Sequence, residues 1–326
     1  MNQALITAKT YHEQGKPFLL FRQPEGPVEL FETFSGLLND EGQCAIIADH
    51  MGSPVGLDTE VTSAESQRDT EKSDFLSWVE QAKQEMADGK LRKVVLSRVR
   101  SIEQRIDPFG LFEKAIEGLP NAFVYLLFSR NSGTWLGASP ERLINWSSQM
   151  VEVDSIAGTI PSEPPPRLSD WGAKELDEQG IVTESIRNTF DDAGVRDVQT
   201  HGPDVLMAGP VSHLHTRISG NLNGDRLGEL VHSLHPTPAV GGMPKSRSQA
   251  FIDQHESHQR RLYTGFLGPK RADGSGTLYV NIRCMELFSD KAQLYLGCGI
   301  TADSIAEDEW NETERKAQTW LDILAD

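Results

Sequence analysis

Glutamates spaced three residues apart occur in two segments that are predicted to be helical. Glu309 and Glu312 lie in the last such segment, and Glu175 and Glu178 lie in an earlier one. Residues three apart share one helix face, so each pair presents two carboxylates in the same direction. Two such faces meeting in the fold would form an oxygen-rich site for a hard divalent cation, and Mg²⁺ suits it because Mg²⁺ keeps waters for substrate oxygens. The alternative interpretation of each pair is a solvated acidic helix face.

A cationic and glycine-rich region near the C-terminus could receive an anion. In TLYVNIRCMELF (residues 277–288), aliphatic and polar residues alternate, which predicts a strand whose polar face carries Arg283. An arginine on that strand could hold a carboxylate with two hydrogen bonds. Gly297 and Gly299 in the nearby LGCGI would let backbone N–H groups approach the same anion. In the alternative interpretation, Arg283 forms an ion pair with a surface acid, and the two glycines mark a β-bulge.

Three further residues are candidates for acid–base chemistry. Lys93 begins the predicted strand KVVLSRVRSI, Glu141 follows Ser139-Pro140 at the end of a predicted hairpin, and His213 lies in VSHLHTRISG. Each has a simpler interpretation. A lysine at a strand edge is commonly exposed to prevent edge pairing. An acid in a turn is commonly exposed as well, and a lone histidine is more often structural than catalytic.

Composition restricts the class of partner. The chain has 326 residues, and its formal net charge is −17, so nucleic acid and anionic membranes would be repelled. A small anionic substrate would also be repelled unless a cation or a local Lys/Arg cluster received it. The three cysteines have no metal-like spacing and are predicted to be reduced and buried. With no signal-like N-terminus and no apolar run long enough to span a bilayer, we expect a cytoplasmic protein.

Hairpin patterns outnumber strand–helix–strand units, which predicts antiparallel sheets flanked by helices in a layered α+β fold. A polar connector is expected from Gly52 to about Lys72, followed by a helix capped by Ser73. Ser304 and Glu307 fit a capping box that would start the last helix near Ile305. The other expected helices cover a segment near the N-terminus and residues 109–118, 172–192 and 246–259. The expected strands lie around 17–21, 44–49, 93–102, 122–128, 133–138, 141–147, 150–159, 205–209, 211–222, 277–288 and 292–300.

Ten segments in this order resemble the chorismate-utilising enzymes. They read KVVLSR, GASPERL, AGT, KELDEQGIV, VSHL-T-ISG, LHPTPAVGG, YTGFLG, YVNIR, GCGI and EWNETERKA. The family includes isochorismate synthase, salicylate synthase and the large components of anthranilate and aminodeoxychorismate synthases. The resemblance covers residues 73–326 as a catalytic core, while residues 1–72 match weakly and are assigned to the same domain. It implies two large antiparallel sheets packed together with helices on the outside.

The resemblance also implies Mg²⁺ dependence and assigns the carboxylate pairs. Glu178 and Glu312 would be direct metal ligands. Glu309 would act directly or through water, and Glu175 would be an outer-sphere neighbour. Lys316 would lie near the metal-bound carboxylate. The substrate would be the dianion chorismate, with one of its carboxylates bridged to the protein by Mg²⁺.

The remaining substrate-binding positions are also assigned by resemblance. Gly158 and Thr159 would cover the ring, and Ala239 would face it. The enolpyruvyl carboxylate would be contacted by Tyr263, Arg283, Gly297, Cys298 and Gly299. His213 matches the active-site histidine of the family.

Lys93 indicates the branch of the family. A lysine here resembles the water-activating base of isochorismate and salicylate synthases. The amine-transferring branch usually differs at this position and works with a glutaminase subunit. The nucleophilic lysine of the aminodeoxychorismate branch is absent, because Ile156 and Ala157 precede Gly158. We therefore expect an isochorismate synthase that feeds menaquinone or siderophore/salicylate biosynthesis. The alternatives are a salicylate synthase, an anthranilate or aminodeoxychorismate synthase component, and an inactive binding homologue.

The mechanism expected from this resemblance is acid–base substitution. Lys93, neutral through desolvation, would take a proton from water attacking C2 of the ring, and a protonated Glu141 would donate to the departing C4 hydroxyl. A monomer without a glutaminase subunit is expected. Two departures from the family pattern are Gln179, where many relatives have histidine, and Ile160-Pro161-Ser162, which replaces a commoner basic sequence.

Overall fold

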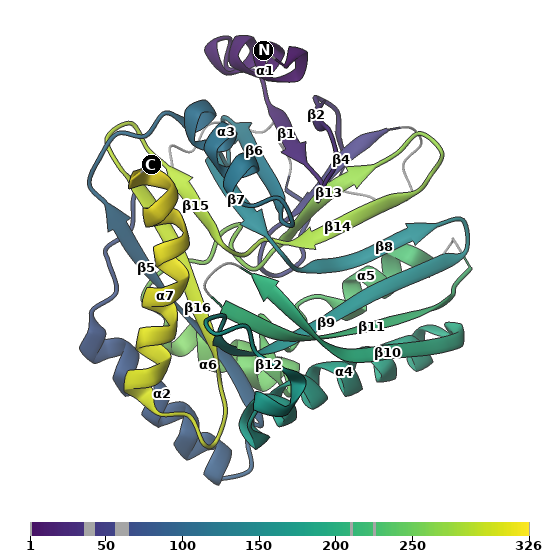
Figure 1. Cartoon of the computed structure of the whole chain (residues 1–326), viewed down its shortest axis with the longest axis vertical. Helices are drawn as coiled ribbons and strands as arrows, with labels where there is room; N and C mark the ends of the chain where they lie inside the picture. Colours follow the sequence, from purple (N-terminus) through teal and green to yellow (C-terminus); the bar gives the residue numbers. More distant parts are fainter. Residues whose placement is uncertain (1, 36–42, 56–64, 209–210, 224–225, 326) are drawn as a thin grey trace.

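The computed structural model describes residues 2–35, 43–55, 65–208, 211–223 and 226–325. Within these residues the strands form two eight-stranded sheets (Figure 1). The order of the first sheet is β12 (Gly242–Met243), β5 (Lys93–Ile102), β16 (Ala292–Ile300), β15 (Cys284–Leu287), β7 (Gly133–Ser139), β6 (Phe123–Ser129), β1 (Phe18–Arg22) and β2 (Val28–Phe31). The order of the second is β10 (Arg196–Ala208), β11 (Val211–Asn221), β9 (Met150–Pro161), β8 (Arg142–Ser147), β14 (Gly276–Val280), β13 (Phe266–Lys270), β4 (Cys44–Ala48) and β3 (Phe34–Ser35). The described strand pairs are antiparallel apart from β3–β4, so the predicted fold class is confirmed.

The helices cover the outer faces of the two sheets. They are α1 (Gln3–Glu13), α2 (Lys72–Ala87), α3 (Pro108–Gly118), α4 (Ala173–Ala193), α5 (Leu227–Leu234), α6 (Lys245–His255) and α7 (Ala306–Ala325). In Figure 1, α7 lies across β16 with α2 beside it, and α4 lies against β9 and β11. One apolar cluster fills the space between the sheets, and others lie beneath the helices. The N-terminal segment takes part in both sheets, since β1 belongs to the first and β4 to the second.

The strands expected over residues 122–138 and 141–159 form two hairpins. β6 pairs with β7 across residues 130–132, and β8 pairs with β9 across residues 148–149. The sequence did not predict β2, β3 and α5, because these elements are short. It also predicted too short a strand for β10, which runs for 13 residues.

Two predicted helix caps and one predicted helix end are wrong. Helix α2 begins at Lys72, and its N-cap Glu71 makes no side-chain capping bond, so Ser73 is not the cap. Helix α7 begins at Ala306, and the Ser304 hydroxyl accepts a hydrogen bond from the Thr301 N–H. Helix α6 ends at His255, four residues earlier than expected, because the backbone of Glu256 is in an extended conformation.

The predicted strand over residues 277–288 is also wrong, and the error concerns the site. The chain leaves the second sheet after β14 and enters the first sheet at β15, so residues 281–283 form a crossover between sheets. Arg283 has φ 50°, a left-handed backbone conformation that residues other than glycine rarely adopt. Arg283 therefore lies on a crossover and not on a strand.

A second crossover runs beside the first. Pro140 and Glu141 connect β7 of the first sheet to β8 of the second. The two crossovers are hydrogen-bonded to each other, since the Val280 N–H donates to the Glu141 carbonyl and the Ala138 N–H donates to the Arg283 carbonyl, both at 3.0 Å. The two sheets are thus joined at a point that brings Glu141 and Arg283 together.

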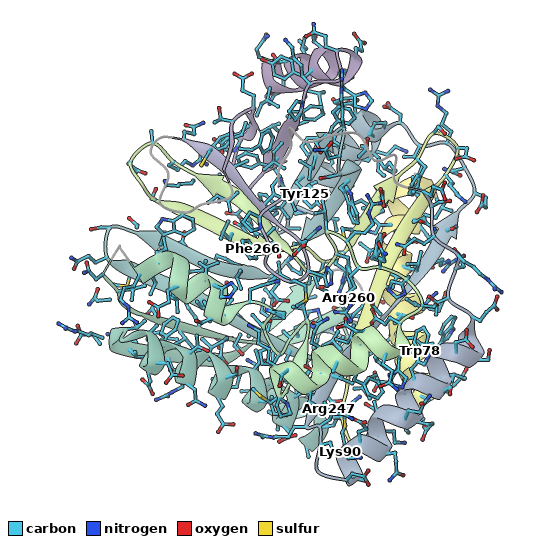
Figure 2. The ribbon with its side chains drawn as sticks, turned by 180° about the vertical axis from the view of Figure 1, so that it is seen from behind. Trp78, Lys90, Tyr125, Arg247, Arg260 and Phe266 are labelled. Atoms are coloured by element: carbon cyan, nitrogen blue, oxygen red, sulfur yellow. The ribbon has the colours of Figure 1, made fainter. Side chains whose placement is uncertain are left out.

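Asn281 fixes the crossover in place. Its side-chain oxygen accepts from the Tyr125 hydroxyl at 2.6 Å, and its amide donates to the Leu262 carbonyl at 2.8 Å. Asn281 is 2% exposed, and Tyr125, labelled in the upper half of Figure 2, is fully buried. A buried polar group that loses its partner is destabilising, so this pair is expected to stabilise the junction strongly.

We predict that Tyr125→Phe lowers the free energy of unfolding by about 1–3 kcal/mol, because it leaves the buried Asn281 oxygen without a donor. Urea denaturation measures the change. Tyr11→Phe is the matched control, since the Tyr11 hydroxyl bonds Glu32 at the exposed surface and its loss should change stability little. Equal effects of the two substitutions would contradict this role for the Tyr125–Asn281 bond.

Candidate active site

A cavity lies where the two crossovers meet the ends of β9, β11 and β16. Eleven of the residues that the sequence selected line this cavity. They are Glu141, Thr159, Glu178, His213, Ala239, Tyr263, Arg283, Gly297, Cys298, Gly299 and Lys316. The segments involved are spread from residue 95 to residue 316, so the cavity is formed only by the complete two-sheet fold.

Lys93 lies beneath the cavity and contacts Glu178. The Lys93 side chain is 1% exposed, and its Nζ is 2.9 Å from Glu178 Oε1. Burial opposes ionisation of Glu178, but Lys93 together with Lys174 and Lys316 lowers the pKa of this carboxyl. Lys93 is therefore not the exposed strand-edge lysine of the simpler interpretation. The structure places the Lys93 amine beside a carboxylate, and the expected neutral amine stays a prediction.

Two further lysines pair with the carboxylates of α7. Lys174 Nζ, on the first turn of α4, lies 2.7 Å from Glu309 Oε1. Lys316 Nζ donates to Glu312 Oε1 at 2.7 Å and to the Gly297 carbonyl at 2.8 Å. Burial and the neighbouring Glu312 raise the pKa of Glu309. Lys174 thus links α4 to α7, and one lysine lies beside each of Glu178, Glu309 and Glu312.

The glycines of β16 allow this close packing. A Cβ at Gly299 would lie 2.3 Å from Glu178 Oε1, and a Cβ at Gly297 would lie 2.4 Å from the Tyr263 hydroxyl. Neither distance is sterically possible, so only glycine lets these side chains approach the strand. β16 pairs with β5 without a register shift, so the alternative interpretation of a bulge is wrong. Between the two glycines, the Cys298 thiol points toward the Glu309 carbonyl at 3.5 Å.

Arg283 is a buried cation that no described side chain neutralises. It is 8% exposed, and within the described residues its guanidinium has no hydrogen-bond or ion-pair partner. Burial lowers the pKa of Arg283 to about 10, which still leaves it charged at neutral pH. The predicted alternative of a surface ion pair is therefore wrong. A buried, unpaired guanidinium on a cavity wall is suited to binding a carboxylate.

Glu141 has the environment of a carboxylic acid that keeps its proton. It is 6% exposed, and burial raises its pKa to about 8 although Lys93 opposes the shift. At neutral pH the group is mostly protonated and can donate a proton into the cavity. The expectation of a protonated Glu141 thus agrees with its surroundings.

His213 is a neutral imidazole that also lines the cavity. Burial, with the charges of Arg283 and Lys316, lowers its pKa to about 3. Its Nδ1 lies 3.3 Å from the Gly158 carbonyl and 3.2 Å from Thr159 Oγ1. Because a carbonyl only accepts, Nδ1 carries the hydrogen, and Nε2 is left as an acceptor.

The loop carrying Ala239 is held against β5 by a buried arginine. Arg260, labelled near the centre of Figure 2, donates to the Val240 carbonyl at 2.9 Å and to the Val95 carbonyl at 2.7 Å. Its charge is balanced by Glu256, at 2.7 Å. This network places Ala239 and Val240 on the cavity wall.

Glu175 does not join the carboxylate cluster. Its Oε2 accepts from the Gly172 N–H at 3.1 Å, which makes it a cap at the start of α4. Spacing on one helix face was therefore a poor guide here, because a glutamate in the first turn also satisfies free backbone N–H groups. The predicted outer-sphere role of Glu175 is not supported by any described contact.

The donor set can be tested against the implied Mg²⁺. In the described part of the chain, no three His, Cys, Asp or Glu side chains are grouped as ligands. The carboxylates of Glu178, Glu309 and Glu312 are each paired with an ammonium instead. Carboxylate oxygens are the donors that Mg²⁺ prefers, and one or two suffice when substrate and water supply the rest. The three carboxylates therefore fit Mg²⁺ if each gives up its contact with a lysine and binds the metal instead.

A family model described as chorismate binding enzyme matches residues 45–325. This chain belongs to that family. The two-sheet architecture agrees with a solved family member, the menaquinone-specific isochorismate synthase of Escherichia coli. That structure superposes with a TM-score of 0.80 at 20% identity, covering 95% of this chain and 89% of the other.

Curated relatives agree with the family assignment. The salicylate biosynthesis isochorismate synthase of Pseudomonas aeruginosa is 30% identical over 275 residues, which cover 81% of this chain and 58% of that protein. Isochorismate synthase EntC of Escherichia coli K12 is 28% identical over 270 residues, which cover 80% of this chain and 69% of that protein. The match thus spans little more than half of the first relative and about two thirds of the second.

The two departures from the family pattern lie outside the cavity lining. The Gln179 amide is 4% exposed and donates to the Ser155 carbonyl at 3.0 Å and to Thr216 Oγ1 at 3.1 Å, so it ties α4 to the second sheet. Ser162 bonds Ser212 between β9 and β11, at 2.9 Å. Both departures therefore make packing contacts outside the cavity lining.

Sequence reasoning missed Lys174 as a site residue. It stands immediately before Glu175 in KELDEQGIV, and only the charge of its partner Glu309 could have suggested the pair. The cavity also includes Val95, Ile156, Tyr295 and Leu296, which periodicity identifies only as core residues. None of the helices in the described ranges is long and apolar enough to cross a membrane.

We predict that Glu141→Gln changes the pH dependence of stability. The folded pKa of about 8 lies above the ordinary value of 4.5, so the folded protein binds more protons between these values. Wild-type stability therefore falls as pH rises through this window, by at most about 1.4 kcal/mol per pH unit for one proton.

Urea denaturation from about pH 5 to about pH 8 measures this difference. The stability of Glu141→Gln relative to wild type should increase with pH across the range. The exposed Glu113→Gln is the control and should keep a constant difference. A constant difference for Glu141→Gln as well would show that Glu141 ionises normally.

Proposed function

We propose that this protein is an isochorismate synthase, which converts chorismate to isochorismate with the help of Mg²⁺. The observation that carries the proposal is the arrangement around one cavity of a protonated buried acid, an unpaired buried arginine and a lysine–glutamate pair. The names of the curated relatives support the same activity. The product would serve menaquinone or siderophore/salicylate biosynthesis.

Binding begins with the two carboxylates of chorismate. Arg283 supplies a charged fork for the enolpyruvyl carboxylate, and the Tyr263 hydroxyl is beside it, facing Gly297. The backbone N–H groups of residues 297–299 can approach the same carboxylate. Gly297 has no side chain that would fill the space beside the Tyr263 hydroxyl. The ring would lie against Ala239, beneath Gly158 and Thr159.

Glu178 and Glu312 would hold Mg²⁺ directly, with Glu309 acting directly or through water. When bound, the ion would fix the second substrate carboxylate and stabilise developing negative charge. The family resemblance and the carboxylate donors support this assignment. It requires Glu178 and Glu312 to exchange their present lysine partners.

The chemistry proposed is substitution with a shift of the double bond. Lys93 accepts a proton from water as the water oxygen bonds to C2 of the ring, the ring double bond shifts, and the C4–O bond breaks. Glu141 donates its proton to the departing hydroxyl, so that water leaves. Lys93 can accept a proton only after it has lost its own, so its ion pair with Glu178 must loosen before this step. The neutral His213 ring can accept a hydrogen bond through Nε2 but holds no proton to donate as imidazolium.

A salicylate synthase would use the same residues and then eliminate pyruvate. Incubation with chorismate and Mg²⁺ separates the two activities, because a salicylate synthase releases pyruvate and an isochorismate synthase does not. An aminating enzyme would need ammonia or a glutaminase subunit, and Lys93 argues against it. We infer a monomeric, cytoplasmic enzyme that acts without a glutaminase.

We predict that Lys93→Met and Glu141→Gln each lower kcat by about 10²–10⁴-fold, the usual contribution of a positioned proton transfer. Chorismate binding, measured by calorimetry, should change much less, because neither residue is assigned to a substrate carboxylate. Chromatographic analysis of isochorismate gives the rate.

Lys90→Met is the matched control, three residues before Lys93 but exposed and paired with Asp88. It should retain full turnover. Substantial turnover by purified Lys93→Met or Glu141→Gln would contradict the assigned roles. No isochorismate from the wild-type protein would overturn the proposed function itself.

A further inference from the structure

Lys174 differs from the other two lysines of the carboxylate cluster. Its Nζ lies 2.7 Å from Glu309 Oε1, and its side chain is 29% exposed while that of Glu309 is 2% exposed. The ammonium therefore reaches from the solvent-facing start of α4 to a buried carboxylate. Glu309 is the one described residue to which it makes a hydrogen bond.

The ammonium of Lys174 also lies in the field of the other two carboxylates. Burial disfavours its charged form, but Glu309, Glu178 and Glu312 together raise the pKa of Lys174. One cation thus serves three carboxylates from two helices. A divalent cation shared by the same carboxylates would compete with it directly.

The other lysines are less free to leave. Lys93 is 1% exposed, so without Glu178 its charge would be buried and unpaired, which is costly. Lys316 is 14% exposed and keeps a second bond to the Gly297 carbonyl. Lys174 is the lysine whose ammonium can return to water by rotating its own side chain.

We propose that Lys174 is a built-in counter-ion, which neutralises Glu309 in the metal-free protein and moves into solvent when a divalent cation binds. This inference rests on the Mg²⁺ site of the proposed function. It makes Lys174 a positioning residue that acts through Glu309, not a residue that contacts the substrate. Its presence stabilises the empty cluster and weakens the apparent affinity for the cation.

Amine acetylation followed by mass spectrometry tests the displacement on the wild-type protein. Addition of Mg²⁺ should increase the acetylation rate of Lys174 by about threefold or more, because an ion-paired amine becomes a solvated one. Lys72 is the internal control, since it pairs with Glu307 on the same helix at the exposed surface and should not respond. Unchanged or reduced labelling of Lys174 would overturn the proposal.

Calorimetric Mg²⁺ titration of Lys174→Met provides the second test. We expect binding about tenfold tighter than in wild type, the change that about 1.4 kcal/mol of lost competition produces. The melting temperature of Lys174→Met should be lower than wild type in chelator and should recover with Mg²⁺. Lys72→Met should behave as wild type in both measurements.

The outcomes separate this inference from the function on which it rests. Equal or weaker Mg²⁺ binding by Lys174→Met, in a protein that still makes isochorismate, would overturn the counter-ion role alone. Absence of Mg²⁺ binding in wild type and variant would overturn both the counter-ion role and the proposed metal. The product assay for isochorismate would then test the proposed enzymatic activity independently of the metal.

Discussion

Charge balance in a buried cluster is the constraint on which the rest of the site depends. Glu178, Glu309 and Glu312 come from two helices far apart in the sequence, and each is partly or fully withdrawn from water. Carboxylates brought together this way repel one another unless cations accompany them. The fold supplies three lysines, from β5, α4 and α7. A protein with a net charge of −17 can in this way hold a concentrated acidic cluster beside a cavity for an anion.

The part of the cavity lined by Arg283 and Glu141 depends on the junctions between the sheets. Arg283 and Glu141 lie on neighbouring crossovers, where the backbone leaves one sheet for the other. A regular strand would direct side chains up or down from a sheet, whereas a crossover can direct them along the gap between sheets. The left-handed backbone of Arg283 is an example of local strain at a site held by surrounding bonds. The charged fork and the protonated acid therefore reach the same cavity from adjacent backbone segments.

Part of this site could be predicted from the sequence. The pairs on α7 and α4 and the glycines of β16 were identified from spacing and composition, and the family resemblance gave the order of the segments. The crossover at residues 281–283 was missed because alternation of aliphatic and polar residues continues through it. The capping contact of Glu175 was missed because helix spacing does not distinguish a ligand from a cap. Lys174 was missed because an ion pair between α4 and α7 leaves no periodic signal in either helix.

We propose that Glu178 of α4 and Glu312 of α7 bind one cation between them. Anomalous scattering from crystals grown with Mn²⁺ in place of Mg²⁺ tests it most directly, because the metal position is then observed independently of activity. We expect one strong peak within coordination distance of both carboxylates, at about 2–2.3 Å. A peak at surface acids alone, or none near these two glutamates, would contradict the account.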